Sequence, residues 1–422
     1  MSSILAVLKN GNFRNLWIAQ IISQVAVNMF AFILLIRVYE QTRSNIAVSG
    51  IVLAIGVPSI LFGIIAGGII DQLDKRQVMV VSNILRAVVL LLFFFLIGFI
   101  PFVYILAFLF SVITQFFIPA EAPYIPSLVT QKQILPATSL FTFSLYASTI
   151  IGFVLSGPLL GFLGTENTFL ILSLIMLIAA FFTFRLPKEA KKRTVINLSL
   201  SRIRGDINDG IKFIQGNNRV KQGLLLLTFS QALIAILASL APGFSDRTLK
   251  IVLTDASYLV MGPAAIGLIL GALFIGGWGR YFLKRALILF GILGAGVTLV
   301  LLSLLVRVSN RVYFSFNIGD IPIGGLEVAI LILFFLGLTN AFISVPATTV
   351  IQEDTKGNFR GRIYGILTSL TGGSAIFPVI FSGILADTVG IGKTLFILGI
   401  IVLLFGIYRL LKLSSTSFNI EK

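Results

Sequence analysis

The 422-residue chain contains no cysteine and no histidine. Without cysteine there are no disulfides and no thiol chemistry, and without histidine the commonest metal ligand and the commonest general base are missing. Charged residues make up only 11% of the sequence, whereas soluble domains carry about 25%. We therefore expect neither an enzyme nor a soluble fold, and no cofactor or metal site.

Hydrophobic residues dominate instead, at 57% of the chain, and the mean hydropathy is +1.04. A chain this apolar cannot cover its surface with polar groups, so its solvent must be lipid. Backbone that crosses a bilayer must satisfy its own hydrogen bonds, either in helices or in a closed barrel. The apolar runs are long and unbroken rather than alternating, so the sequence predicts helices.

Twelve apolar runs are predicted to span the bilayer, which takes about 20 residues. They are 15–36, 46–70, 77–100, 101–120, 133–165, 167–184, 222–245, 256–279, 286–306, 328–352, 363–386 and 394–408. The prediction is an all-α membrane protein with twelve transmembrane helices in two six-helix bundles, residues 1–184 and 222–422. A basic cytoplasmic linker at 185–221 joins the bundles, and a short cytoplasmic tail follows the last helix.

The formal net charge of +16 has a topological explanation. With the N-terminus in the cytoplasm, 24 of the 32 Lys and Arg residues lie in predicted cytoplasmic segments and 7 in predicted external loops. This asymmetry follows the positive-inside rule and predicts that both termini are cytoplasmic. We therefore expect a monomeric, multi-pass protein of the cell membrane that binds no nucleic acid and has no cleavable signal peptide.

The linker has apolar residues at helical spacing, with charged residues between them. The apolar positions are Leu200, Ile203, Ile207, Ile211 and Ile214. This pattern suits an amphipathic helix at the inner membrane surface. A solvated linker with some helix fits it equally well.

A charged stretch, GGIIDQLDKR at 67–76, has an altered copy, GGWGRYFLKR, at 276–285. Both lie between the second and third helices of their half. The copy keeps the paired glycines and the terminal cations but has Arg280 in place of Asp71. Internal repeats of this kind are common in transporters.

These features resemble the major facilitator superfamily, and the resemblance covers nearly the whole chain. The family's loop motif, G-x-L-A-D-R-x-G-R-K, is matched by Gly67, Asp71, Lys75 and Arg76 and departs at Ile70, Gln72 and Asp74. The stretches NILRA (83–87), DINDGIKFIQGNN (206–218) and RGRIYGILTSL (360–370) are most similar to the branch with macrolide efflux pumps and the enterobactin exporter. The resemblance implies two bundles related by a pseudo-two-fold axis along the membrane normal.

The loop motif is predicted to form an inner gate. Its glycines permit close helix packing, and Asp71 can meet the positive N-terminus of a neighbouring helix, which in the family is the eleventh. Lys75 and Arg76 can pair with Glu121 at the inner end of helix four. The alternative is that both cations only anchor the chain on its cytoplasmic side.

A second motif, GPLLG at 157–161, resembles the fifth-helix glycine–proline motif of the superfamily's antiporters. Gly157, Pro158 and Gly161 match it, while Phe153 and Phe162 replace two of its glycines. In the family this motif favours export over import. The alternative is an ordinary helix kink, because proline removes a helix hydrogen bond.

Amide side chains are candidates for a substrate cavity between the halves near mid-membrane. Gln20, Gln24 and Asn28 fall on one face of helix one. Further candidates are Gln115, Tyr146, Ser230, Gln231 and Asn340. With 38 Phe residues in the chain, such a cavity suits a bulky amphipathic or apolar solute. Hydrogen bonding between helices is the alternative for each amide.

Charges inside the spans are scarce. Arg86 is the only one well inside a span, and such residues are functional by default. Structural pairing is an equally good interpretation, and its partner is not obvious. No Asp or Glu lies mid-span, so proton coupling rests on Glu121 and Glu327, the deepest carboxylates near helix ends.

Together these features predict a secondary exporter of drug, macrolide or siderophore type that works by alternating access, with protons as a candidate coupling ion. The alternative is an uncoupled facilitator or channel, or an importer of a small uncharged solute. No G-x4-G-K-[ST] phosphate loop is present, which argues against a pump driven by ATP.

Asp71→Asn tests the inner-gate interpretation. We expect the variant to express and fold normally but to lose transport, because the amide cannot supply the negative charge that the helix N-terminus attracts. Undiminished efflux in a whole-cell accumulation assay would contradict the gate.

Overall fold

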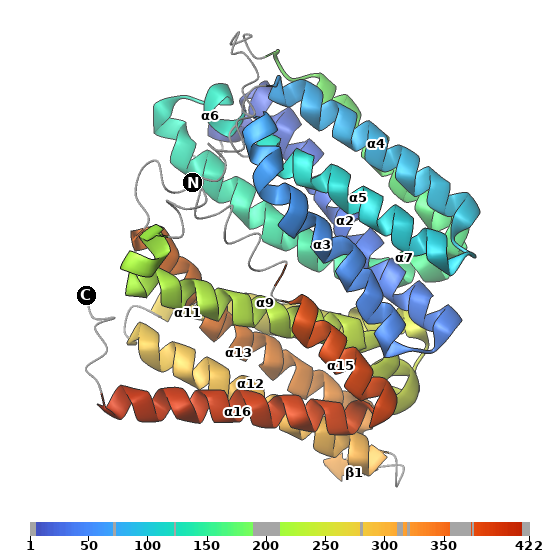
Figure 1. The fold of residues 1–422 in the computed structure, drawn as a ribbon, viewed down its shortest axis with the longest axis vertical. Coiled ribbons are helices and arrows are strands. Elements are labelled where there is room, and N and C mark those ends of the chain that lie inside the picture. The colour runs from blue at the N-terminus through green and yellow to red at the C-terminus, as the bar shows by residue number, and fades with distance from the viewer. Residues whose placement is uncertain are drawn as a thin grey trace. The chain divides into compact units, whose positions relative to one another are not determined.

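The structure is a computed structural model, and it describes residues 6–70, 73–121, 124–188, 212–278, 282–309, 315–318, 321–354, 373 and 375–415. The chain forms two compact units (Figure 1). The first consists of Met1–Leu34 and Leu53–Asn208, and the second of Leu35–Val52 and Asp209–Lys422. A segment from early in the sequence, Leu35–Val52, therefore belongs to the second unit.

The first unit is helical throughout its described residues. Its elements are α2 (Gly11–Thr42), α3 (Asn45–Ile70), α4 (Lys75–Leu96), α5 (Ile100–Glu121), α6 (Ile125–Leu128), the short 3-10 helix η2 (Gln131–Gln133) and α7 (Ile134–Phe184). The end of α2 and the start of α3 extend into the second unit.

The 51-residue helix α7 is two helices joined at a break. Gly164 has φ 72° and ψ 172°, a left-handed backbone conformation that glycine adopts at little cost. The break falls where the predicted spans 133–165 and 167–184 meet. The fifth and sixth spans are thus present as two helices on either side of Gly164.

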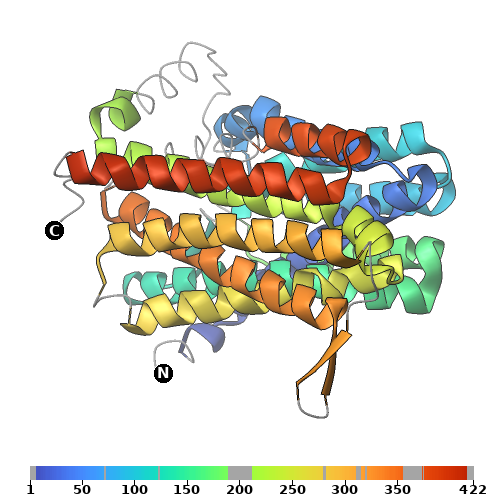
Figure 2. The same ribbon diagram turned by 90° about the horizontal axis from the view of Figure 1, so that it is seen from below.

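The second unit is built mainly from helices and contains a short hairpin. Its elements are α9 (Asn218–Phe244), the π-helical turn η3 (Ser245–Leu249), the 3-10 turn η4 (Leu253–Asp255), α10 (Ala256–Leu259), α11 (Met261–Trp278), α12 (Lys284–Ser309), β1 (Ser315–Ile318), β2 (Ile321–Gly324), α13 (Gly325–Asp354), α15 (Ile376–Thr388) and α16 (Ile391–Ser415). Strands β1 and β2 pair antiparallel, with Ser315 opposite Gly324. This hairpin projects beyond the helices of its unit (Figure 2), and the sequence did not predict it.

The described residues contain ten helices long and apolar enough to cross a membrane. The broken helix α7 supplies two of the predicted spans, and α15 is a shorter apolar helix that overlaps the end of the predicted eleventh span. The described helices therefore agree with twelve membrane-spanning segments. The predicted amphipathic helix lies almost entirely outside the described residues.

Aromatic rings form the centre of the first unit. The Phe30 ring on α2 lies 5.2 Å from Phe93 on α4, 4.3 Å from Phe110 on α5 and 6.3 Å from Phe169 on α7. Phe93 and Phe169 stack at 5.0 Å. These buried rings pack four helices together, and edge-to-face and stacked pairs add to the energy of burial.

Glycines bring the helices of the second unit into close contact. A Cβ at Gly267 on α11 would overlap the carbonyl of Phe334 on α13, and one at Gly337 on α13 would overlap the carbonyl of Ala264 on α11. Such small residues let helix backbones approach closely in lipid. The pairing of α11 with α13 therefore depends on glycine at these positions.

The paired glycines of the second charged loop do not pack in this way. A Cβ at Gly276 or Gly277 would have no described atom within 4 Å. Packing of these two glycines against another helix is therefore not seen among the described residues. The packing glycines lie further back along α11.

Gly267→Ala should lower the melting midpoint of the purified protein in detergent, because the added methyl group meets the backbone of α13. Overpacking of this kind costs about 1–3 kcal/mol. Gly276→Ala is a matched control on the same helix, since its methyl group has room. Equal midpoints for the two variants would contradict the close contact of α11 with α13.

Candidate functional site

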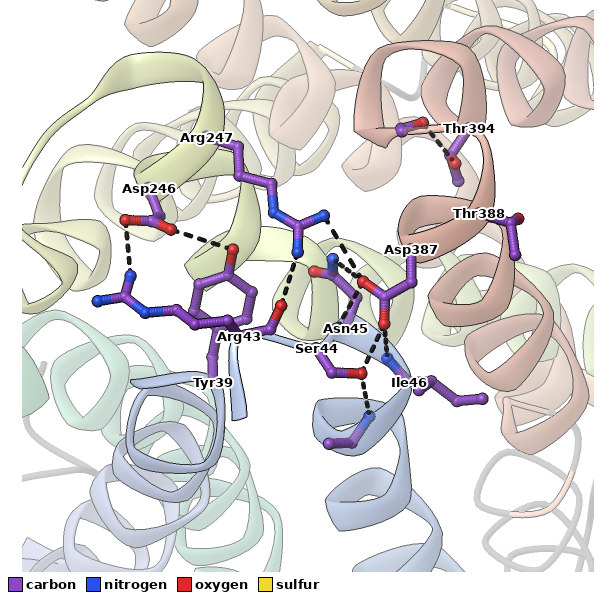
Figure 3. A network of polar contacts seen from close by, with 12 residues as sticks. Tyr39, Arg43, Ser44, Asn45, Ile46, Asp246, Arg247, Asp387, Thr388 and Thr394 are labelled. Carbon is purple, nitrogen blue, oxygen red and sulfur yellow. Dashed lines mark hydrogen bonds and ion pairs between the residues drawn. The ribbon is translucent and has the colours of Figure 1, made fainter. Parts of the chain in front are cut away.

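A polar network in the second unit surrounds the connection between α2 and α3 (Figure 3). The carboxylate of Asp387, near the end of α15, accepts hydrogen bonds from Ser44 Oγ at 2.6 Å, Asn45 Nδ2 at 2.8 Å, and the backbone N–H groups of Asn45 and Ile46 at 2.9 and 3.0 Å. These N–H groups belong to the first turn of α3 and have no partner within the helix. Asp387 thus caps α3 from another helix, where the helix dipole favours a negative charge.

The π-helical turn η3 supplies the second part of the network. Arg247 lies 3.7 Å from the Asp387 carboxylate and donates a 2.6 Å hydrogen bond to the carbonyl of Arg43. Asp246 accepts from the Arg43 guanidinium at 2.9 Å and from the Tyr39 hydroxyl at 3.2 Å. The two neighbouring residues of η3, one acidic and one basic, therefore hold opposite sides of the same connection.

The connection needs this support because Arg43 has a φ of 53°. A non-glycine residue in this left-handed region is uncommon and costs about 1–3 kcal/mol unless its surroundings determine it. Both the backbone carbonyl and the guanidinium of Arg43 are bound by η3. The network therefore stabilises a strained turn.

Close packing accompanies the hydrogen bonds. A Cβ at Gly383 on α15 would meet the Asn45 carbonyl at 2.9 Å, and the Ser49 hydroxyl donates to the carbonyl of Val379 at 3.0 Å. The start of α3 and the helix α15 thus touch through backbone atoms. Substitution of Gly383 would separate them.

Asp387 follows the predicted eleventh span, and its surroundings change its acidity. Partial burial raises its pKa, but the hydrogen bonds from Ile46, Ser44 and Asn45 outweigh this effect and hold the pKa below its ordinary value. Because the pKa is lowered in the folded state, the stabilisation is present at neutral pH. It is lost as the pH falls through the folded-state pKa.

None of the expected site residues belongs to this network. One signal was visible: the polar run Thr42-Arg43-Ser44-Asn45 separates two apolar spans and carries helix-capping residue types. The sequence holds no corresponding signal for the partners, which lie 203 to 343 residues further along the chain.

Two opposite charges are buried in the first unit. Arg86 on α4 is 1% exposed and Glu121 at the end of α5 is 3% exposed, and the two charges attract each other. Arg86 donates to Asn83 Oδ1 at 3.3 Å, and its guanidinium lies 4.3 Å from the centre of the Phe117 ring. Among the described residues no ion pair joins Arg86 to a carboxylate, and its hydrogen-bond partner is Asn83 on the same helix.

This arrangement corrects the expected pairing of Glu121 with Arg76. The Arg76 guanidinium donates to the backbone carbonyl of Phe184 and lies 4.7 Å from the centre of the Phe184 ring. Asp74 caps α4 by accepting from the Arg76 backbone N–H at 3.0 Å. Arg76 thus contacts the end of α7, and the described residues show no ion pair between Arg76 and Glu121. Lys75 begins α4.

The expected type of ion pair is present in the second unit instead. Lys284, which begins α12 and corresponds to Lys75 in the repeat, contacts the Glu353 carboxylate at 2.7 Å. Arg219 at the start of α9 adds contacts of 3.4 Å to Asp354 and 3.8 Å to Glu353. The start of the third helix and the end of the fourth are therefore paired by charge in the second copy.

The amides predicted to line a cavity differ in their surroundings. Gln20 is fully buried and donates to the Phe141 carbonyl at 3.1 Å. Asn28 donates to the Gln24 carbonyl one turn earlier on α2, at 2.7 Å. The side chains of Gln24 and Asn28 are partly exposed, so they have more freedom to contact a solute than that of Gln20.

The remaining cavity candidates lie on α5, α7, α9 and α13. Asn340 is buried and exchanges hydrogen bonds with Ser230, at 2.9 Å between side chains and 3.3 Å to the Ser230 carbonyl. This pair joins α9 to α13 and fits the alternative of helix packing. Gln115 is buried and Gln231 is exposed. The side chain of Tyr146 lies outside the description.

The motif residues are accounted for only in part. Pro158 lies within α7, but the break in that helix is at Gly164, and a Cβ at Gly161 would have no described atom within 4 Å. Gly157 lies in the same helix. Gly67 lies in the last turn of α3, while Asp71 and Arg280 fall outside the described residues.

Glu327 lies at one end of a helix that is long enough to cross a membrane. It is exposed in the first turn of α13 and accepts a 2.8 Å hydrogen bond from the backbone N–H of Gly324. This carboxylate fixes the junction of β2 with α13.

Comparison with known proteins gives consistent results. A family model described as Major Facilitator Superfamily matches residues 16–378. Macrolide efflux protein A of Streptococcus pyogenes is 22% identical over 407 residues, which cover 94% of both chains. The uncharacterized MFS-type transporter YfiS of Bacillus subtilis (strain 168) is 22% identical over 386 residues, covering 90% of this chain and 87% of that protein.

Solved structures of transporters share the fold. The nucleoside transporter NupG matches with a TM-score of 0.72 at 13% identity, covering 94% of this chain and 98% of its own. A bacterial homolog of the human lysosomal transporter Spinster matches with a TM-score of 0.72 at 11% identity, covering 95% and 96%. At these identities the likeness concerns the fold alone, and the predicted fold class is confirmed.

Asp387→Ala tests the polar network. The variant leaves the first turn of α3 without its cap and Arg247 without its carboxylate, so we expect a loss of about 1–3 kcal/mol and a lower melting midpoint at neutral pH. The difference from the unmodified protein should shrink in acid, because protonation weakens the same interactions there.

The matched control is Glu166→Ala, which removes an exposed carboxylate from α7. We expect its midpoint to stay close to that of the unmodified protein. A midpoint for Asp387→Ala as high as that of the control would contradict the capping role.

Proposed function

The chain belongs to the Major Facilitator Superfamily and is a multi-pass membrane transporter, and from this premise we propose that it is a secondary active exporter of bulky amphipathic or apolar small molecules. The substrates we propose are of the macrolide class, with other drugs and siderophores as further candidates. The transporter would work by alternating access in the cell membrane, with both termini in the cytoplasm.

The observation that carries this proposal is the similarity to macrolide efflux protein A along 94% of both chains. Similarity over the full length includes the segments on both sides of the linker, so it does not rest on one shared motif. The chemistry of the spans supports the same class of substrate. Gln24 and Asn28 offer partly exposed amides in the mainly apolar middle of α2.

An anionic substrate fits the chain poorly. The buried cations in the described residues both contact the protein: Arg76 binds the Phe184 carbonyl, and Arg86 binds Asn83 and lies over the Phe117 ring. Neither is free to neutralise a phosphate or a carboxylate. An uncharged or amphipathic molecule needs no such partner.

We propose that the network around the α2–α3 connection has two states in the transport cycle, one with its contacts closed and one with them open. We assign it to the external side, since the positive-inside rule places this connection there. Asp387, Asp246 and Arg247 hold the connection in one state, and opening of these contacts would accompany the other. Small changes at such an element can be amplified because its two packings are discrete.

Export is tested by expressing the chain in a pump-deficient bacterial host. We expect reduced accumulation of radiolabelled erythromycin and a higher inhibitory concentration, both reversed by a protonophore, because secondary export depends on the ion gradient. Asp71→Asn serves as the inactive control, with expression checked by immunoblot.

Two results would contradict the proposal in different ways. Faster equilibration of erythromycin in both directions, insensitive to the protonophore, would indicate an uncoupled facilitator. Unchanged accumulation of macrolides, dyes, siderophores and lipophilic cations would exclude export of this class of solute.

A further inference from the structure

The hairpin between α12 and α13 carries an inference that does not depend on the transported substrate. In its antiparallel register, Phe316 of β1 lies opposite Ile323 of β2, and two positions further on Ile318 lies opposite Ile321. Successive residues of a strand alternate between the two faces of a sheet, and residues directly opposite each other share a face. The register therefore assigns one phenylalanine and three isoleucines to a single face of the hairpin.

The opposite face has a different composition. The register pairs Ser315 with Gly324 and Asn317 with Pro322, so this face consists of polar, small and proline positions. Apolar and polar residues thus alternate along the strands with a period of two. Such alternation is typical of a strand with one face covered and the other in water. The hairpin is therefore amphipathic.

Water is a poor environment for such a hairpin. A two-stranded hairpin alone is at best marginally stable in water, and it needs a further surface against its apolar face. Strand edges that lie in water are usually protected by charged side chains. Neither β1 nor β2 contains a charged residue. The composition of both strands thus favours contact with an apolar surface.

The direction of the hairpin shows which surface is near. In Figure 2 the long helices of the second unit run across the picture, whereas the orange hairpin points away from them. Strand β2 continues directly into α13, and the Glu327 carboxylate binds the backbone N–H of Gly324 at 2.8 Å. Because α12 and α13 are long and apolar enough to cross the membrane, a hairpin that turns aside from them runs along the membrane surface.

The lipid-facing surface of these two helices reaches the base of the hairpin. Leu304 and Val308 are exposed along the last two turns of α12, and Leu331 is exposed near the start of α13. Arg307 and Glu327 are exposed charges at the same two helix ends, where long charged side chains can reach the headgroups. The hairpin therefore begins at the boundary between hydrocarbon and headgroups.

We propose that the hairpin is a membrane-surface element whose partner is the lipid of the bilayer that surrounds α12 and α13. The face with Phe316 and the three isoleucines lies against the acyl chains, and the face with Ser315 and Asn317 lies toward headgroups and water. Amphipathic helices bind the membrane interface by burying their apolar face, and the same physics applies to an amphipathic ribbon. The hairpin thereby holds the start of α13 at a fixed depth.

Site-directed spin labelling tests the proposal in the full-length protein. The chain has no cysteine, so single nitroxide labels can be placed at Ser315→Cys, Phe316→Cys, Asn317→Cys and Ile318→Cys. In nanodiscs of phosphatidylcholine and phosphatidylglycerol, the labels are exposed to molecular oxygen, which concentrates in lipid, and to a water-soluble nickel chelate. We expect labels 316 and 318 to favour oxygen and labels 315 and 317 to favour nickel.

Two reference labels set the scale of these accessibilities. Leu304→Cys is exposed on α12 and should report lipid, while Lys188→Cys is exposed beyond the end of α7 and should report water. Equal exposure of all four hairpin labels to nickel would overturn the proposal, because the hairpin would then lie in water. Protection of labels 316 and 318 from both reagents would also overturn it, because protein would then cover the apolar face.

A second variant tests whether the apolar face causes the binding. Ile318→Ser combined with Ile321→Ser removes half of the apolar face, so we expect the label at Phe316→Cys to gain nickel accessibility. The matched control is Asn317→Ser, which changes the opposite face and should leave that label in lipid. The label at Leu304→Cys should stay in lipid in both backgrounds. An unchanged label at Phe316→Cys in the double serine variant would contradict the role of the apolar face.

Discussion

Every backbone polar group that crosses the bilayer must find its hydrogen-bond partner inside the protein. This constraint explains why the described spans are helices and why each irregular point along them has a local cause. The break in α7 lies at a glycine with positive φ. The strained turn at Arg43 is bound by η3, and the first turn of α3 is capped by Asp387. Polar side chains thus support the backbone at the α2–α3 connection, while others such as Ser230 and Asn340 join helices to one another.

Both units meet this constraint by close helix packing. Phenylalanine rings pack against one another in the first unit and in the second. Glycines allow close helix contacts at Gly152 in the first unit and at Gly267 in the second. The units differ in their charges, because the first buries Arg86 and Glu121, whereas the second has ion pairs at helix ends.

The sequence predicted what depends on local pattern. Unbroken apolar runs located the spans, including the two that meet at Gly164, and Arg86 stood out as a charge inside one of them. Partners were harder to predict, because they depend on which helices touch. Glu121 was expected to hold Arg76, yet Arg76 binds the end of α7. Asp387 was missed because a single carboxylate after an apolar run carries no sign of the helix that it caps.

The account depends most on the claim that the contacts around the α2–α3 connection open and close during transport. The chain has no cysteine, so spin labels can be placed at Ile46→Cys and Val389→Cys. Both positions are exposed. Ile46 donates its backbone N–H to Asp387, and Val389 follows Asp387 by two residues. The distance between the labels can then be measured by pulsed electron paramagnetic resonance in lipid nanodiscs. We predict two distances whose proportions change with pH and with added erythromycin. A single distance that neither treatment alters would contradict the account.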